Sequence, residues 1–293
     1  MGKITDYSAV TSLVAANVLL LDGTEGTKTI TAENLAKSLA GVYPATGEAN
    51  FFTMLDNIAS PNLHRMIFRG ASLGTSITAT QLANISNGSF KGLWLGDYWT
   101  INSKVYRIVD FDYWYNVGDT AFTSHHVVIM PDANMYNAVM NDENTTVGGY
   151  FGSKMRGVTV TSGGTDTFTP YAYGCGLYDA LTTLRSAFGS AHILSHREYL
   201  DTTVTDGEES AGAWEDSLIE IPSEIMIYGT HIRTMNSHIA VSSKQQLALM
   251  QACPKFINTR STYWLRDVVS ATHFANVSNF GYAVYNDAST SLG

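Results

Sequence analysis

Two β-rich stretches, at residues 93–101 and 104–111, are separated only by Asn102 and Ser103. A connection of two residues joins antiparallel neighbours, because parallel strands need a crossover of about a dozen residues or more. The two stretches therefore predict a β-hairpin. An antiparallel hairpin in the middle of the chain argues against a fold built wholly from strand–helix–strand units.

Helices are predicted at several positions, without regular alternation with the strands. Residues 78–81 (Thr-Ala-Thr-Gln) match a capping box and predict a helix that runs to Asn87 and Gly88. A second helix is predicted from apolar residues at helical spacing, with Gly189 after its end; these residues are Leu177, Leu181, Leu184 and Phe188. Two more helices are predicted, one beginning at Pro131 and one over residues 244–253.

The remaining stretches predict short strands and loops. Residues 126–130 form a third apolar strand, and Ile193 with Leu194 predicts a short buried strand after which Ser195 caps the next turn. Residues 201–217 are acidic and are expected to form a solvated loop. A doubly wound α/β fold would require regular strand–helix alternation, so the expected fold class is α+β.

Composition excludes several classes of protein. The chain has 293 residues, of which 45% are hydrophobic and 15% charged, and its formal net charge is −9. Phosphate recognition needs basic stripes, so we expect no nucleic-acid binding. The longest apolar run, at residues 13–21, is interrupted by Asn17 and is about half the ~20 residues that cross a bilayer. We therefore expect no membrane insertion, and the first residues do not resemble a secretory signal.

The sequence contains no local motif for catalysis or metal binding. It lacks a Gly-x-Ser-x-Gly elbow and the familiar Gly-rich phosphate loops. His125 and His126 lie on opposite faces of a predicted strand, so they do not ligate one metal together. Cys175 and Cys253 show no metal-ligand spacing and are expected to be reduced thiols. We expect no catalytic residue, no metal and no cofactor, although a carboxylate pair assembled across the fold would leave no local trace.

The terminal segment, residues 262–293, is rich in aromatic residues, His, Asn, Ser and Thr, and contains neither Lys nor Glu. Antibody paratopes use a similar mixture, because large rings give rigid contact area and Asn and Ser give adaptable hydrogen bonds. A purely structural role explains residues 263–266 but not the later polar residues, which are poor core formers. The segment is therefore expected to face a ligand, with its small residues as scaffold.

Several segments resemble the C-type lectin-like domains of phage and gut bacterial proteins. They are residues 263–266 (Tyr-Trp-Leu-Arg), the small residues that follow them, and residues 96–102, 149–156 and 221–229. The resemblance covers residues 66–293 and implies a C-type lectin-like domain with short antiparallel strands and flanking helices. The calcium-binding triplets of true C-type lectins are absent, so calcium-dependent sugar binding is not implied. In the family a further strand follows the residue that corresponds to Gly293.

Some members of this family are variable proteins of diversity-generating retroelements, including phage proteins that bind receptors on host cells. In those proteins the terminal segment varies between fixed scaffold positions. The resemblance and the composition together predict these ligand-binding residues: Asp267, Thr272, His273, Asn276, Ser278, Asn279, Phe280, Tyr282, Val284, Tyr285, Asn286 and Asp287. Trp264, Leu265 and Arg266 are expected to anchor the fold instead.

The N-terminal part is predicted to be an attachment unit at residues 1–42, joined by a connector at residues 43–65. Two short strands, at residues 18–21 and 28–30, precede a predicted helix that begins after Thr31 and ends at Gly41. A unit this small buries too little apolar surface to be stable alone. Residues 3–6 and 29–36 are similar to the leading segments of phage tail-fibre and head-fibre proteins, where they serve for attachment.

These expectations together describe a virion-surface protein, a tail or head fibre, that binds a host-cell receptor, either protein or glycan. The N-terminal unit would contact other virion proteins, and similarity to fibres implies a homotrimer. One alternative is a structural head-fibre or decoration protein without a dedicated receptor. A second is an enzyme of the formylglycine-generating type, which shares the lectin-like fold but depends on active-site cysteines.

Overall fold

The computed structural model describes residues 61–160, 166–234 and 245–293, together with residues 18–21, 28–31, 52–53 and 55–56. The chain divides into two compact units, Met1–Ala59 and Ser60–Gly293. The boundary between the two units falls within the predicted connector.

In the first unit, β1 (Val18–Leu21) and β2 (Lys28–Thr31) pair antiparallel, with Val18 opposite Thr31. The pairing confirms the two short strands predicted there. The helix predicted after Thr31, and the rest of the attachment unit, lie outside the described residues.

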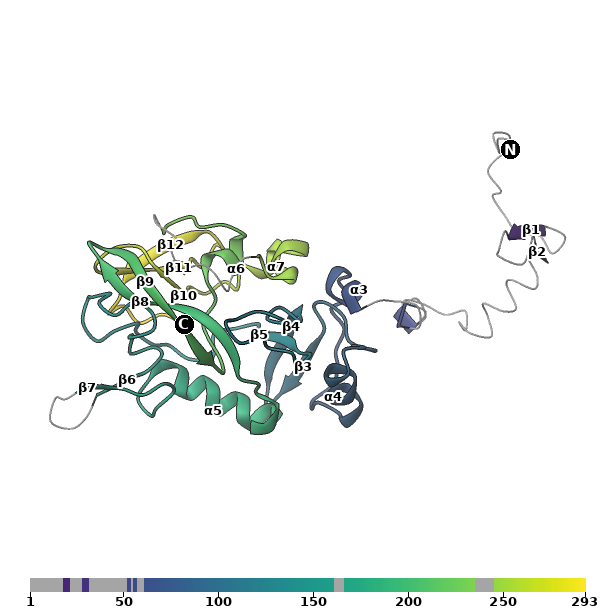
Figure 1. Cartoon of the computed structure of the whole chain (residues 1–293), viewed down its shortest axis with the longest axis horizontal. Coiled ribbons are helices and arrows are strands. Elements are labelled where there is room, and N and C mark those ends of the chain that lie inside the picture. The colour runs from purple at the N-terminus through teal and green to yellow at the C-terminus, as the bar shows by residue number, and fades with distance from the viewer. Residues whose placement is uncertain are drawn as a thin grey trace, which may run out of the picture. The chain divides into compact units, whose positions relative to one another are not determined.

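The predicted hairpin is present in the second unit (Figure 1). β3 (Tyr98–Ile101) pairs with β4 (Lys104–Phe111), and β5 (Val127–Pro131) pairs with the other edge of β4. Asn102 and Ser103 have φ of 50° and 63°, and a type I′ turn requires positive φ at both central positions. Because this turn matches the twist of the strands, two residues are enough to set the register.

Two predicted helices are confirmed, one by its N-terminal cap and the other by the face that it buries. α4 (Ala79–Ser86) begins with a complete capping box, in which the Thr78 side chain accepts from the Gln81 backbone and the Gln81 side chain accepts from the Thr78 backbone. α5 (Gly176–Phe188) ends at Gly189. The residues that α5 buries are Leu177, Ala180, Leu181 and Phe188.

The described part of the second unit also contains three short helices. α3 (Pro61–Met66) begins the second unit, and α6 (Glu224–Tyr228) is capped by Ser223, whose side chain accepts from the Met226 backbone at 3.2 Å. α7 (Ala248–Ala252) is followed by the 3-10 turn η2 (Pro254–Phe256). α7 is shorter than the helix predicted over residues 244–253, whose first residue lies outside the described part.

Residues 201–217 do not form the predicted acidic loop. They belong to a long hairpin, in which β8 (His196–Thr205) and β9 (Glu208–Ser217) pair antiparallel around Asp206 and Gly207. These turn residues have φ of 54° and 83°, which an Asp-Gly pair adopts readily. The prediction was wrong because some of its acidic residues point inward; Asp201 and Glu209 are buried.

The helix predicted from Pro131 is absent, and residues 132–141 run as an irregular segment. Ala138 forms an antiparallel bridge with Leu292, and the Asn134 side chain donates to the carbonyl of Thr262 at 2.9 Å. Bonds to the distant end of the chain therefore replace the local bonds of a helix.

Ile193 and Leu194 do not form the predicted buried strand. They follow the 3-10 turn η1 (Ser190–His192), and the Leu194 side chain is 38% exposed. Ser195 caps no helix, because β8 begins directly after it. A further small hairpin consists of β6 (Val158–Val160) and β7 (Asp166–Phe168).

The terminal segment forms an antiparallel sheet in the order β10-β11-β12, from β10 (Tyr263–Val268), β11 (His273–Val277) and β12 (Ala283–Asp287). In Figure 1 this sheet, coloured yellow, lies on the side of the unit away from α5. The Trp264 backbone N–H donates to the carbonyl of Gly293 at 3.0 Å, so the end of the chain also packs on β10.

The buried apolar residues form two clusters. One contains Trp99, Tyr106 and Leu249, and the other contains Tyr150, Trp264 and Phe274. Helices and several small antiparallel sheets surround these clusters, which confirms the α+β class. Of the helices that the structure describes, none has the length and apolarity needed to cross a membrane.

Candidate functional site

β10 anchors the terminal sheet in the core. All of its residues are buried, and Trp264, Leu265 and Arg266 are 1%, 0% and 6% exposed. The Trp264 indole N–H donates to the carbonyl of Ala138 at 3.0 Å, and the Arg266 guanidinium forms an ion pair with Glu198 of β8. The expectation that residues 264–266 hold the fold is confirmed.

β12 forms the opposite edge of the sheet and alternates between inward and outward side chains. Tyr285 and Asp287 are exposed, whereas Val284 and Asn286, which alternate with them, are half-buried. His273 of β11 lies directly opposite Asp287 in the register, and its Nε2 is 2.9 Å from Asp287 Oδ1. The His273 and Tyr285 rings meet edge to face at 5.1 Å. These three residues therefore share one face of the sheet.

The turn between β11 and β12 presents two more aromatic rings. Phe280 and Tyr282 are 71% and 55% exposed, and their rings are parallel with centroids 6.2 Å apart. Ser278 Oγ accepts from both of their backbone N–H groups, at 3.2 and 3.3 Å. Gly281 has φ of 89°, and a Cβ there would lie 3.0 Å from Asn258. The buried Ser278 hydroxyl and a left-handed glycine thus fix this turn.

We call the exposed rings Phe280, Tyr282 and Tyr285, with His273, Asn279 and Asp287, the terminal surface. The predicted ligand-binding residues fall into three groups by exposure. Asn279, Phe280, Tyr282, Tyr285 and Asp287 are exposed; Thr272, His273, Val284 and Asn286 are half-buried; Asp267, Asn276 and Ser278 are buried. Val284 and Asn286 alternate with Tyr285 along β12 and so lie on the other face of the sheet. The buried members lie among the packed residues that support the surface.

Arg233 supports the terminal surface but was not predicted from the sequence. Its guanidinium carbon is 5.8 Å from the centre of the Tyr285 ring, and its Nε donates to the carbonyl of Ala283 at 3.1 Å. It therefore holds β12 by a backbone hydrogen bond and Tyr285 by a cation–π contact. A single arginine in a polar stretch carries no sequence pattern from which this role could be inferred.

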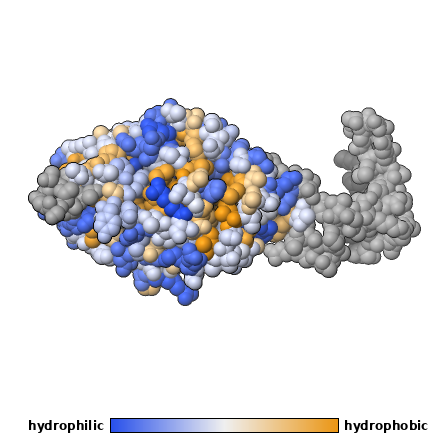
Figure 2. Space-filling view, turned by 90° about the horizontal axis from the view of Figure 1, so that it is seen from below, coloured by the Kyte–Doolittle hydropathy of each residue, from blue (hydrophilic) through white to orange (hydrophobic). Residues whose placement is uncertain are grey.

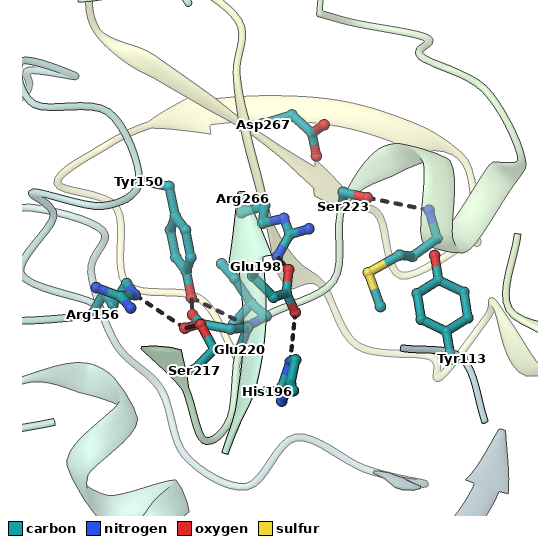
Figure 3. Close-up of polar contacts among 12 residues, drawn as sticks. Tyr113, Tyr150, Arg156, His196, Glu198, Ser217, Glu220, Ser223, Arg266 and Asp267 are labelled. Atoms are coloured by element: carbon teal, nitrogen blue, oxygen red, sulfur yellow. Dashed lines mark hydrogen bonds and ion pairs between the residues drawn. The ribbon is translucent and has the colours of Figure 1, made fainter. Parts of the chain in front are cut away.

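Beneath the sheet, Glu198 joins two basic side chains. Its Oε2 pairs with Arg266, and its Oε1 is 3.0 Å from His196 Nε2 (Figure 3). Burial alone would raise the pKa of Glu198, but the positive charge of Arg266 and the contact with His196 lower that pKa to about 2. Glu198 is therefore ionised at neutral pH and ties β8 to β10.

Glu220 is the central acceptor of a second buried hydrogen-bond network (Figure 3). Its carboxylate accepts from the hydroxyls of Tyr150 and Ser217, at 2.5 and 2.7 Å, and from Nε of Arg156 at 3.0 Å. Burial, together with the Glu220 charge, raises the pKa of Tyr150 well above its ordinary value. Buried polar contacts of Tyr150 and Arg156 thus fix the run at residues 148–156.

A third group of buried acids lies close to β10. Burial raises the pKa of Asp201 to about 6, and burial reinforced by the Glu224 carboxylate raises that of Asp267 to about 7. Burial, together with the carboxylates of Asp201 and Asp267, raises the pKa of Glu209 well above its ordinary value. Arg266 opposes these shifts without cancelling them. These buried acids beneath the terminal sheet are therefore suited to sharing protons or to holding a cation.

Glu224, His231 and Asp267 are the described residues that could hold a metal ion. Each offers one ligand atom, and these atoms lie within 4.8 Å of one another. No local pattern marks them, because they come from α6, the loop after it and β10. His125 and His126, which the sequence analysis considered as metal ligands, lie outside this group. His126 is buried, and Nδ1 of the half-buried His125 is 2.8 Å from Asp112 Oδ2.

The unit also has an apolar groove of about 590 Å³. Its walls include Met130, Met135, Leu184 and Phe188, with His196 and Glu198 among its few polar groups. In Figure 2, apolar residues gather near the middle of one face around a few hydrophilic ones. None of the predicted ligand-binding residues lines this groove.

The two cysteines are separate free thiols. Cys175 is buried, and its Sγ donates to the carbonyls of Val158 and Thr169 at 3.6 and 3.9 Å. Cys253 is half-buried at the end of α7, where it packs against the Trp99 cluster. The structure records no disulfide between them.

Comparison with protein-family models, with curated proteins and with solved structures finds no match to this chain. A functional conclusion therefore rests on the residues and their geometry.

Proposed function

We propose that this chain is a receptor-binding protein of a phage virion and that it contacts a host-cell receptor through the terminal surface. The exposure of Phe280, Tyr282 and Tyr285, at 71%, 55% and 49%, carries the proposal. Large exposed rings on one turn and on the strand that follows it favour binding, because an incoming partner buries their apolar area and stacks on them.

The scaffold beneath these rings supports recognition. β10 is wholly buried, and the turn that carries Phe280 and Tyr282 is fixed by Ser278 and Gly281. A binding surface whose backbone is already ordered loses less conformational entropy when it binds. The terminal surface therefore combines exposed side chains with a rigid support.

The polar groups around the rings suit both kinds of receptor in this proposal, glycan and protein. The His273–Asp287 pair and the exposed Asn279 offer hydrogen-bond donors and acceptors beside apolar faces. Glycans and protein loops both present apolar patches flanked by hydroxyl or amide groups. This mixture suits adaptable recognition of either receptor type.

The assignment to a virion fibre is supported by the sequence resemblances. Residues 66–293 resemble C-type lectin-like domains of phage proteins, and residues 3–6 and 29–36 are similar to fibre attachment segments. In this proposal residues 1–42 contact other virion proteins, and the chain acts as a homotrimer without catalysis. Several copies then add weak contacts by avidity. The outward positions of β12 are the ones that diversification would vary.

Binding of the labelled full-length protein to a panel of bacterial strains tests the proposal. We expect binding restricted to some strains, and a loss of about tenfold or more in the variant Tyr282→Ala/Tyr285→Ala. Tyr173→Ala is the matched control, because Tyr173 is 79% exposed outside the terminal surface. Strain-independent attachment that the double variant leaves unchanged would contradict receptor binding and favour a decoration protein.

A further inference from the structure

We propose that Glu224, His231 and Asp267 form a binding site for one divalent transition-metal ion, with Zn²⁺ as the best match. The ion would fasten the segment at residues 231–234 beneath the terminal surface. The metal site itself does not depend on the proposed function. The effect of the ion on receptor binding rests on the proposed function.

The distances between the three side chains suit a shared ion. Their ligand atoms lie within 4.8 Å of one another, and His231 Nδ1 is 3.7 Å from Asp267 Oδ1. That separation is too long for a hydrogen bond. Ligands at ~2.0–2.1 Å from a tetrahedral Zn²⁺ lie about 3.3 Å apart. Small side-chain rotations are therefore enough to complete the shell.

Three polar side-chain atoms at this place lack a hydrogen-bond partner among the described residues. Both ring nitrogens of His231 and the hydroxyl oxygen of Thr234 are buried, and none has a hydrogen-bond partner among the described residues. Buried polar atoms are nearly always satisfied, and exceptions point to a bound ion or water. An ion coordinated by His231 would give one of its buried ring nitrogens a partner.

The charge balance also favours a cation. Glu224 is 0% exposed and Asp267 is 5% exposed, and two carboxylates this close repel each other in a medium of low polarity. Arg266, the neighbour of Asp267 in β10, already pairs with Glu198. Figure 3 shows the Asp267 carboxylate apart from that pair and on the side of Ser223 and α6. A divalent ion would neutralise the two carboxylates.

Backbone groups orient both carboxylates as an outer shell. The Glu224 carboxylate accepts from the N–H groups of Ile232, Arg233 and Thr234, at 2.9 to 3.2 Å. Asp267 Oδ2 accepts from the Glu224 N–H at 2.7 Å, which leaves Oδ1 facing His231. Such outer contacts commonly fix the ligands of metal sites before the ion arrives.

The donor set selects the kind of ion. Ca²⁺ and Mg²⁺ prefer shells made only of oxygen, whereas an imidazole suits Zn²⁺ and its transition-metal neighbours. One imidazole and two carboxylates are three protein ligands, which leaves a fourth position for water or for a group of a bound partner.

Arg233 connects the proposed ion site to the terminal surface. Its backbone N–H is bound to Glu224, and its side chain contacts Ala283 and Tyr285. An ion held by His231 and Glu224 thus restrains the segment that supports β12. Removing the ion is expected to loosen Tyr285 without unfolding β10.

Metal analysis of the full-length protein tests the site. After chelation and dialysis, titration with Zn²⁺ alone is expected to show one ion per chain, with Ca²⁺ in tenfold excess failing to compete. Co²⁺ is expected to give the absorption bands of a low-symmetry nitrogen and oxygen site. The variants His231→Ala and Asp267→Asn are expected to bind Zn²⁺ at least tenfold more weakly. His192→Ala, which changes an exposed histidine elsewhere, is expected to bind as the parent does.

The change in Tm on adding Zn²⁺, measured for each variant against its own metal-free form, tests the site even where a substitution alters stability. Zn²⁺ is expected to raise the Tm of the parent and of His192→Ala, and to leave the Tm of the conservative variant His231→Gln unchanged. Equal Zn²⁺ binding by the parent and His231→Ala, or no stoichiometric binding by the parent, would overturn the proposal. Zinc binding by a protein that attaches to no cell would leave the metal site standing and count against the proposed function only.

Discussion

Arg266 of β10 and Glu198 of β8 form an ion pair in which both side chains are almost completely buried, at 7% and 1% exposure. The pair joins the long hairpin to the terminal sheet. Since His196 contacts the other oxygen of Glu198, the carboxylate is held from two sides.

Removing one member of this pair should destabilise the protein strongly, because it leaves an uncompensated buried charge. We expect Arg266→Met to lower the free energy of unfolding by about 3–5 kcal/mol, measured by urea denaturation. Arg197→Met is the control from the same strand as Glu198. Its partners Asp119 and Asp216 are largely exposed, so the expected loss is at most about 1 kcal/mol. Equal losses in the two variants would contradict the assigned role of the buried pair.

Asp201 should make stability fall as pH rises. Burial raises its pKa from an ordinary value near 3.8 to about 6, so the folded protein keeps a proton that the unfolded chain releases. The stability from this group is full below about pH 4, is lost as pH rises through 6, and stays lost above. Two pKa units correspond to roughly 3 kcal/mol. Asp201→Asn cannot ionise and should gain up to that amount at pH 8 and almost nothing at pH 4.

Chemical denaturation of both proteins at several values between pH 4 and 8 measures this difference. Asp206→Asn is the matched control, because Asp206 lies in the exposed turn of the same hairpin with φ of 54°, which asparagine tolerates. The prediction fails if the Asp201→Asn curve runs parallel to that of the parent.

Arg233 should affect binding more than folding. Its cation–π contact with Tyr285 is worth about 0.5–1 kcal/mol at an exposed site, so Arg233→Ala is expected to weaken attachment to receptor-bearing cells by about two- to fivefold. Arg185→Ala on the exposed face of α5 should leave attachment unchanged. Binding curves on a strain that the parent recognises provide the measurement, and identical curves for the two variants would rule out the supporting role of Arg233.

Local patterns in the sequence predicted the elements that local interactions determine. The Asn102-Ser103 turn and the Thr78–Gln81 capping box each carry their own geometry, and both are present. The β8–β9 hairpin also had a local pattern in Asp206-Gly207, but its acidic residues suggested a solvated loop. The buried ones, Asp201 and Glu209, accept from the backbone N–H groups of Tyr150 and Val268, which lie far away in the sequence and become neighbours only in the fold.

The terminal surface could be located from composition but not resolved residue by residue. Aromatic, Asn and Ser residues occur together at residues 262–293, yet Asn276 and Ser278 are buried whereas Asn279 and Phe280 are exposed. Side chains alternate between the two faces of β12, and this alternation could have been inferred from the sequence once the strand was assigned. Glu224, His231 and Asp267 could not have been grouped in advance, because only tertiary packing brings them together.

The complete burial of β10 has a consequence for how this protein can change over generations. Trp264, Leu265 and Arg266 are buried in the core, whereas Tyr282, Tyr285 and Asp287 are exposed. Substitutions at such exposed positions usually change stability by no more than about 0.5 kcal/mol. The outer edge of the sheet can therefore accept many different side chains while every variant remains folded, so new binding preferences can arise without intermediates that fail to fold.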